Sequence, residues 1–115
     1  HLIRQIGIDN RSVTTLAGTD GTPGTTDDTG TSASFHGPTG IATDGSNLYV
    51  ADRTGHLIRR IVISTGVVTT LAGSISGSTN ATGTSAKFKA PSGITSDGID
   101  LYVLDKNNHR IRKID

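Results

Sequence analysis

The sequence contains no cysteine, methionine, tryptophan or glutamate, and its only glutamine is Gln5. Glutamate, methionine and glutamine are good helix formers, so their scarcity argues against an all-α fold. Without cysteine the chain has neither a disulfide framework nor thiol chemistry. No apolar run approaches the roughly 18 residues that a membrane-spanning helix needs. The chain opens at His1 rather than at methionine and shows no signal peptide, so we expect it to be processed or excised.

Charge and apolar content are also low. The 11 Lys and Arg residues nearly balance the 10 acidic residues, so the net charge is +1. Such a chain has no global field that attracts nucleic acid or a membrane. Hydrophobic residues make up 32% of the chain and aromatic residues 3%, which is thin for a self-sufficient core. Threonine, serine and 15 glycines are abundant instead, and these residues favour strands and turns.

The sequence repeats itself. Residues 13–18 and 68–73 both read Val-Thr-Thr-Leu-Ala-Gly, and the pattern His-x-Ile-Arg-x-Ile occurs at 1–6, 56–61 and 109–114. The offset between copies is 55 residues before the long Gly/Ser/Thr loop and 53 after it. A fixed period of this size indicates a repeat architecture.

One period contains four short strand candidates, at 39–43, 47–51, 56–63 and 67–71. Four antiparallel strands in a repeat of this length describe one blade of a β-propeller. We therefore predict an all-β fold of about two blades per chain, an incomplete propeller. With the strands of a blade lettered A to D outward from the axis, the chain reads C-D, A-B-C-D, A-B-C.

These strands divide the chain into five parts. The expected parts are a partial blade at 1–18 (strands C-D), a long D–A loop at 19–37, a complete four-stranded blade at 38–73, a second long D–A loop at 74–90 and a partial blade at 91–115 (strands A-B-C). Each blade buries its faces on two neighbours, and closed propellers use about 4–8 blades. One copy of the chain therefore cannot close a ring.

Several motifs resemble those of an NHL repeat. They are Pro38-Thr39-Gly40-Ile41-Ala42, Tyr49-Val50-Ala51-Asp52 and Asn108-His109-Arg110-Ile111. The Val-Thr-Thr-Leu-Ala-Gly strand and the Ala-x-Phe pattern before Pro38 and before Pro91 are similar to the long-loop NHL variety of bacterial extracellular proteins. The resemblance covers nearly the whole chain and implies a β-propeller. The composition, rich in Thr, Ser and Gly without Cys or Met, suits an extracellular or secreted protein.

The histidines and loop acids are the residues of the variable face. His1, His56 and His109 occupy equivalent B–C turns, on the same face as the long D–A loops. Because equivalent residues lie a blade apart, while metal ligands sit about 2 Å from the ion, we expect them to stabilise turns. The acids of the first loop lack the spacing of a calcium loop, so a solvated loop is expected there. The interaction-face candidates are therefore His56, His109, Asp20, Asp27 and Asp28.

The remaining polar and aromatic residues have structural readings. Asp52 and Asp105, at strand ends, are expected to accept backbone N–H bonds across the following turn. Arginines recur along the C strands, and we expect them to pair with Asp. The aromatics Phe35, Phe88, Tyr49 and Tyr102 stand at expected packing positions, with the two phenylalanines filling the gaps between blades. This leaves no stacking platform of the kind that binds single-stranded RNA.

No catalytic constellation stands out. The sequence has no Gly-x-Ser-x-Gly elbow and no phosphate-binding loop. Some NHL relatives are lyases or hydrolases with a metal at the propeller axis, but the ligands would have to come from blades that this chain lacks. We predict no catalytic residue, no metal site and no cofactor. Two sequons, Asn10-Arg11-Ser12 and Asn80-Ala81-Thr82, make Asn10 and Asn80 candidate N-glycosylation sites.

These observations predict a non-enzymatic structural and interaction module. Exposed strand edges at both ends favour self-association into a ring or filament, unless the chain is part of a longer extracellular protein. The expected partners are other copies of the chain or further blades, and a glycan, with no nucleic acid and no membrane insertion. The alternatives are a propeller that binds a protein or glycan ligand and, less favoured, a metal-dependent lyase or lactonase-type enzyme.

Overall fold

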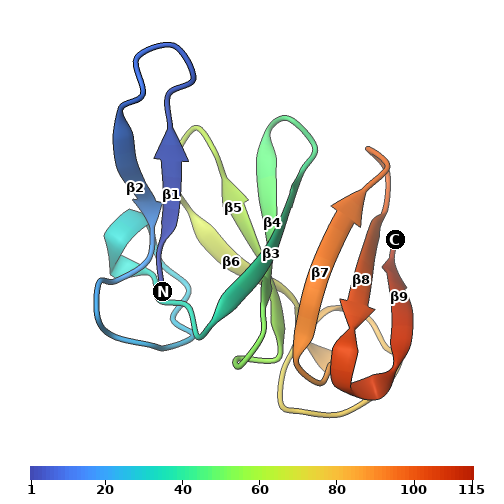
Figure 1. The fold of residues 1–115 in the computed structure, drawn as a ribbon. Helices are drawn as coiled ribbons and strands as arrows, with labels where there is room; N and C mark the ends of the chain where they lie inside the picture. The colour runs from blue at the N-terminus through green and yellow to red at the C-terminus, as the bar shows by residue number, and fades with distance from the viewer.

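The fold consists of three antiparallel sheets that stand side by side like blades of a fan (Figure 1). The computed structural model describes all residues, 1–115. The first sheet pairs β1 (Ile3–Ile6) with β2 (Val13–Ala17); the second contains β3 (Pro38–Thr43), β4 (Asn47–Asp52), β5 (Leu57–Val62) and β6 (Val68–Gly73); the third contains β7 (Pro91–Ser96), β8 (Leu101–Asp105) and β9 (Arg110–Ile114). The strands of each sheet follow chain order. This confirms the all-β partial propeller with the order C-D, A-B-C-D, A-B-C.

Three single-turn 3-10 helices complete the structure. They are η1 (Gly30–Ser32) and η2 (Gly83–Ser85) in the two D–A loops and η3 (Lys106–Asn108) between β8 and β9. None of them has the length or the apolar character needed to cross a membrane.

The hydrophobic core is divided between the two blade interfaces. The first cluster joins the first two sheets and consists of Ile3, Ala17, Ala33, Phe35, Val50, Ile61 and Val68. The second joins the last two sheets and consists of Ala51, Ile58, Ala72, Ala86, Phe88 and Val103. Phe35 and Phe88 come from the D–A loops and are fully or almost fully buried, which confirms that they fill the gaps between blades. A low apolar content suffices because each sheet buries apolar side chains on its neighbours rather than around one large centre.

The inner strands of neighbouring blades approach closely at the Pro-x-Gly motif. A Cβ atom added at Gly40 in β3 would lie 2.7 Å from the carbonyl oxygen of Ser92 in β7. No larger side chain fits there without displacing backbone. The glycine of the motif therefore allows β3 and β7 to pack side by side.

The turns between the A and B strands are built alike in both blades. Oδ1 of Asp44 accepts hydrogen bonds from the backbone N–H groups of Ser46 and Asn47 at 2.9 and 2.7 Å. The hydroxyl of Tyr49 donates to the other oxygen of Asp44 at 2.7 Å. Tyr102 and Asp97 repeat this bond at 3.0 Å. The tyrosine hydroxyls thus bind the turns. The sequence alone predicts only a packing role for these two residues.

Candidate functional site

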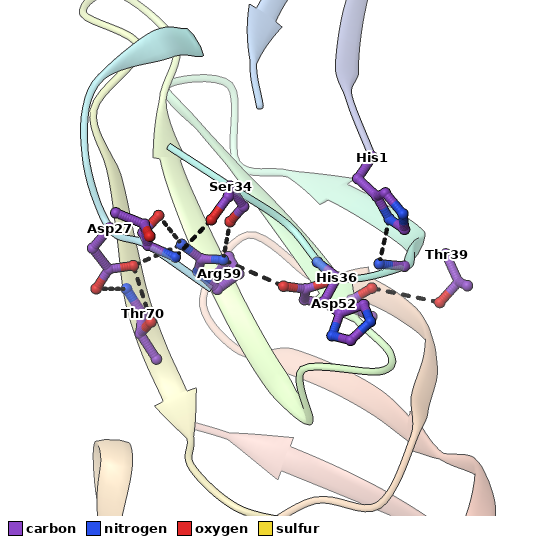
Figure 2. Close-up of polar contacts among 11 residues, drawn as sticks. His1, Asp27, Ser34, His36, Thr39, Asp52, Arg59 and Thr70 are labelled. Atoms are coloured by element: carbon purple, nitrogen blue, oxygen red, sulfur yellow. Dashed lines mark hydrogen bonds and ion pairs between the residues drawn. The ribbon is translucent and has the colours of Figure 1, made fainter. Parts of the chain in front are cut away.

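A buried arginine in the C strand anchors the long loop that precedes its blade. Arg59 in β5 is fully buried, and Figure 2 shows its guanidinium between Asp27 and Asp52. Nη1 donates to the carbonyl oxygen of Ser34 at 2.8 Å and lies 3.3 Å from Oδ2 of Asp52. Nη2 donates to the carbonyl oxygen of Thr26 at 2.9 Å and to Oδ1 of Asp27 at 2.8 Å. One side chain thus holds two separate points of the first D–A loop.

The carboxylate of Asp52 completes this anchor from the end of β4. It is fully buried, and its Oδ1 accepts the backbone N–H of His36 at 2.7 Å. Burial raises the pKa of Asp52, while the hydrogen bond from His36 and the charge of Arg59 act in the opposite direction. In the third sheet Asp105 accepts the N–H of Lys89 in the same way. The expectation that these aspartates accept backbone N–H bonds across the following turn is corrected: the backbone N–H groups that they bind belong to the end of the preceding loop.

The same arginine packs on the phenylalanine that fills the blade interface. The guanidinium carbon of Arg59 lies 5.0 Å from the ring centroid of Phe35, and the corresponding distance from Arg112 to Phe88 is 4.9 Å. These distances suit cation–π contacts, which are stronger when desolvated. The anchor therefore joins the loop, the apolar interface and the C strand in one cluster.

Asp27 extends the anchor to the outermost strand of the blade. Besides Arg59, its carboxylate accepts the backbone N–H of Thr70 in β6 at 2.9 Å and the Thr70 hydroxyl at 3.0 Å. Thr29 forms an antiparallel bridge with Val67 just before β6. The first D–A loop thus lies along the outer edge of the middle blade and clamps its D strand.

The acidic residues of this loop consequently differ in role. Asp20 and Asp28 are exposed, and Asp28 accepts the backbone N–H of Thr29 at 2.7 Å. Asp27 is also partly exposed but is bound on two sides, to Arg59 and to Thr70. The expectation of a solvated loop therefore describes Asp20 and Asp28 and not Asp27.

The second copy of the anchor uses a neutral amide in place of Asp27. Arg112 in β9 pairs with Asp105 at 2.8 Å and donates to Oδ1 of Asn80. Asn108 adds a contact that the first copy lacks, because its Nδ2 donates to Asp105 at 2.8 Å and to the carbonyl oxygen of Gly77 at 2.7 Å. The first copy has Gly55 at that position, where a Cβ atom would lie 3.1 Å from Oδ2 of Asp52.

A groove of about 720 Å³ lies beside the second anchor, along the unpaired edge of β9. One wall is the second D–A loop from Asn80 to Gly83, and the other is β9. Its floor includes Ala72, Ala86 and Phe88, which belong to the core between the last two blades. The groove is therefore continuous with an apolar interface inside the chain.

The histidines of the B–C turns connect each blade to the next. Nδ1 of His1 accepts the backbone N–H of Gly37 at 2.9 Å, and Nδ1 of His56 accepts that of Ala90 at 3.1 Å. His56 and His109 both have positive φ, at 61° and 55°. The backbone of these residues shapes the turn, as expected, but the rings of His1 and His56 bind the following loop. His109 is exposed and its ring forms no hydrogen bond.

The structure also shows where the two sequon asparagines lie. Asn10 lies in the exposed β1–β2 turn, where its Oδ1 accepts the N–H of Ser12 at 3.0 Å. Asn80 is exposed but bound to Arg112.

No three His or Asp side chains come close enough together to hold a metal ion. Arg60, one residue beyond Arg59, donates to the Asn47 side chain rather than to an aspartate.

The ion pairs of Arg59 with Asp52 and of Arg112 with Asp105 agree with the expectation that C-strand arginines pair with Asp, and the spacing of the sequence identifies which aspartate each one binds. Asp52 precedes Arg59 by the same spacing as Asp105 precedes Arg112, and both pairs fall at equivalent positions of the repeat. Equivalent placement of opposite charges on neighbouring strands is what a repeated ion pair requires. The loop partners of each arginine had no such signal, because their own copies differ in sequence.

Comparison with known sequences finds relatives that share this repeat. The chain is 33% identical over 125 residues to human NHL repeat-containing protein 2, and the match covers 98% of this chain and 17% of the human protein. The bovine protein of the same name gives the same values. The chain thus spans about a sixth of the length of these curated relatives. No family profile matches it.

Solved structures with the same arrangement of strands come from Bacteroides thetaiotaomicron. One is a protein described as an auxiliary nutrient binding protein, with a TM-score of 0.78 and 26% identity over 99% of this chain and 32% of that chain. Another, of unknown function, has a TM-score of 0.84 and 26% identity, and covers 97% of this chain and 29% of its own. These similarities agree with the blade architecture described above.

Proposed function

This chain belongs to the NHL-repeat family, and from that membership we propose that it is a non-enzymatic interaction module that assembles by packing blade upon blade. Its partners are further copies of itself or further blades of the same protein. The observation that carries the proposal is the exposure of apolar side chains on the outer faces of the first and last sheets. The residues at the equivalent positions of the middle blade are buried in the core.

The face of the first sheet is uncovered. Ile6 is 63% exposed and Val13 46% exposed. Their equivalents in the middle blade, Ile61 and Val68, are buried in the first core cluster. The first sheet thus presents the surface with which a blade packs on its predecessor.

The outer face of the last sheet, at the other end of the chain, is also uncovered. Ile111 is 66% and Leu104 48% exposed, whereas the equivalent Ile58 and Ala51 are fully buried against the third sheet. The last sheet thus presents the surface with which a blade packs on its successor. Two such faces on opposite ends of one chain produce head-to-tail contacts, which give rings when the rotation closes and filaments when it does not.

Analytical ultracentrifugation over a range of protein concentrations tests this proposal. We expect concentration-dependent association, and we expect Ile111→Lys to weaken it because a charge would have to be buried in the contact. Ile99→Lys is the matched control, because Ile99 is 90% exposed in a turn away from both faces. A dispersed monomer at all concentrations would contradict the proposal.

The same chain has a second candidate function as part of an extracellular propeller that binds a ligand. Supporting it is the likeness to a protein described as an auxiliary nutrient binding protein. The D–A loops and the B–C turns, with His56, His109 and Asp20, form the variable face on which such a ligand would bind. A glycan array and a pull-down with the whole chain test this function, and binding that is lost with a loop substitution such as Asp20→Ala supports it.

A further inference from the structure

The groove along β9 corresponds to the place that a D strand occupies in the middle blade. There β6 pairs with β5, and Val68 of β6 contributes to the first core cluster. The third sheet has no such D strand, so none contributes to the second core cluster from that sheet. Because Phe88 and Ala86 of that cluster also line the groove, a strand bound beside β9 would extend an existing apolar interface.

A strand with the required sequence exists in the chain as β2. Residues 13–18 repeat the sequence of residues 68–73, which include all of β6. Yet β2 is held less firmly than β6, because Thr15 lacks the two bonds that its equivalent Thr70 forms with Asp27. Val13 is 46% exposed, whereas the equivalent Val68 is 1% exposed. β2 therefore has the sequence of a strand that is buried and hydrogen-bonded like β6, but within its own chain it is more exposed.

The strand that β2 pairs with is a shorter version of β9. β1 and β9 share the pattern Ile-Arg-x-Ile, at 3–6 and 111–114. β9 pairs with β8 in a sheet that also contains β7, whereas the only partner of β1 is β2. A sheet of four strands buries more surface than a hairpin, which is marginally stable by itself.

We propose that β9 of one copy displaces β1 of a second copy and pairs with its β2, so that the two partial blades merge into one complete blade. This inference rests on the proposed self-association and names the strand exchange that produces it. Ile111 of the first copy takes the place of Ile3 in the second, and Val13 of the second copy extends the core beside Phe88 of the first.

The register of the exchanged pair follows from the repeat. Arg60 of β5 faces Thr69 of β6, and the equivalent residues are Lys113 of β9 and Thr14 of β2. Within one copy Thr14 faces Gln5 of β1 instead. Directly opposed residues have Cβ atoms about 4.5–5.5 Å apart, close enough for a disulfide after a small adjustment. The chain has no cysteine, so introduced thiols report on this pairing alone.

Disulfide trapping tests the exchange directly. A mass-tagged Thr14→Cys chain is mixed with a Lys113→Cys chain and oxidised mildly. We expect the mixed disulfide to form in preference to the one between Lys113→Cys and Ile8→Cys. Ile8 is 94% exposed in the β1–β2 turn and serves as the matched control. Equal trapping of both pairs, or none of either, overturns the exchange.

A locked hairpin separates this inference from the proposed function. Gln5→Cys combined with Thr14→Cys in one chain ties β1 to β2 and blocks the exchange. We expect the oxidised form to sediment as a monomer and the reduced form to associate. If the oxidised form associates as well, the exchange is overturned while blade packing stands. If neither form associates but a synthetic peptide of residues 67–73 binds the groove, the strand comes from elsewhere and the exchange between copies is overturned.

The anchor beside the groove gives a gain-of-affinity test. Asp27 accepts both the N–H and the hydroxyl of Thr70, whereas Asn80 offers only one acceptor oxygen, which Arg112 uses. Asn80→Asp is therefore expected to tighten the association about tenfold, the effect of one hydrogen bond to a charged group. The gain should depend on Thr15, so Thr15→Val removes it and Thr14→Val, on the exposed face, leaves it. A gain that persists with Thr15→Val overturns the assigned register.

Discussion

Nη1 of Arg59 lies 3.3 Å from Oδ2 of Asp52, and both side chains are fully inaccessible to solvent. Removing two charges from water costs several kcal/mol per ion, and their mutual attraction offsets this only when the remaining polar atoms are also bound. Here the carbonyl oxygens of Ser34 and Thr26 and the N–H of His36 bind the two Nη atoms and Asp52, whereas Nε of Arg59 is buried without a hydrogen-bond partner. The pair is therefore stable only as part of the folded loop, and it makes the loop a structural part of the blade.

Replacing one member of this pair should be strongly destabilising. We expect Arg59→Met to lower the free energy of unfolding by about 3–5 kcal/mol, because Asp52 stays buried without a counter-charge. Arg60→Met is the control on the same strand, and as a surface substitution it should change the free energy by no more than about 0.5 kcal/mol. Urea unfolding measures both. Adding Asp52→Asn to Arg59→Met should recover part of the loss, and a purely additive double variant would contradict the coupling.

The contact of Asp27 with two strands predicts a local effect on the D strand. Asp27→Ala leaves Nη2 of Arg59 with one partner fewer and removes both acceptors of Thr70. We expect a loss of about 1–3 kcal/mol and faster hydrogen exchange at the Thr70 amide. Asp28→Ala, in the exposed part of the loop, should leave the Thr70 amide protected. Similar exchange rates in both variants would show that the loop does not hold β6.

The histidines allow a matched comparison of one hydrogen bond. His56→Ala and His109→Ala both place alanine at positive φ, so the backbone strain is similar in the two variants. Only His56→Ala also removes the acceptor of the Ala90 N–H. We expect it to be more destabilising than His109→Ala by about 1 kcal/mol, measured by denaturant unfolding. The comparison fails if the two variants unfold alike.

The turn aspartates predict how stability depends on pH. Hydrogen bonds from Asn47, Tyr49 and Ser46 hold the pKa of Asp44 far below its usual range, and backbone N–H groups do so for Asp97. A lowered folded-state pKa contributes stability above the unfolded value of about 3.9, and this contribution is lost as the pH falls toward the folded value. The melting temperature should therefore fall when the pH is lowered through this range.

Substitution isolates the contribution of these two turns. Asp44→Asn with Asp97→Asn should show a smaller loss of melting temperature on acidification than the unchanged chain, because neither amide titrates. Burial raises the pKa of Asp52, so the titration of this carboxyl acts with the opposite sign. An unchanged acid dependence in the double variant would assign the effect to other carboxylates.

Part of this architecture could be predicted from residues alone. The fixed period, the turn dipeptides and the alternating strands identify four-stranded blades, and the strand order C-D, A-B-C-D, A-B-C follows by counting. The position of Phe35 and Phe88 between blades could also be predicted, because a large apolar residue beside the A strand of a repeat can be buried only on a neighbour.

The loop partners of the two arginines could not be predicted, because they come from a distant and variable part of the chain. Arg59 reaches Ser34 and Asp27 across 25 and 32 positions of the chain. Nothing in the spacing of Asp20, Asp27 and Asp28 distinguishes the one that binds Arg59 from the two that are solvated. The direction of Asp52, toward the preceding loop rather than the following turn, likewise depends on how that loop folds back over the end of β4.

Residue patterns alone identify a propeller with partial blades at both ends, because hydrophobic alternation and turn residues are local properties that recur in every copy of the repeat. The folded chain alone shows what the two outer sheets expose: an apolar face on the first sheet, a complementary one on the last, and a groove beside β9 at the place that β6 occupies in the middle blade. These features arise from contacts between blades, and a contact between segments that are far apart in the chain leaves no periodic trace in the order of the residues.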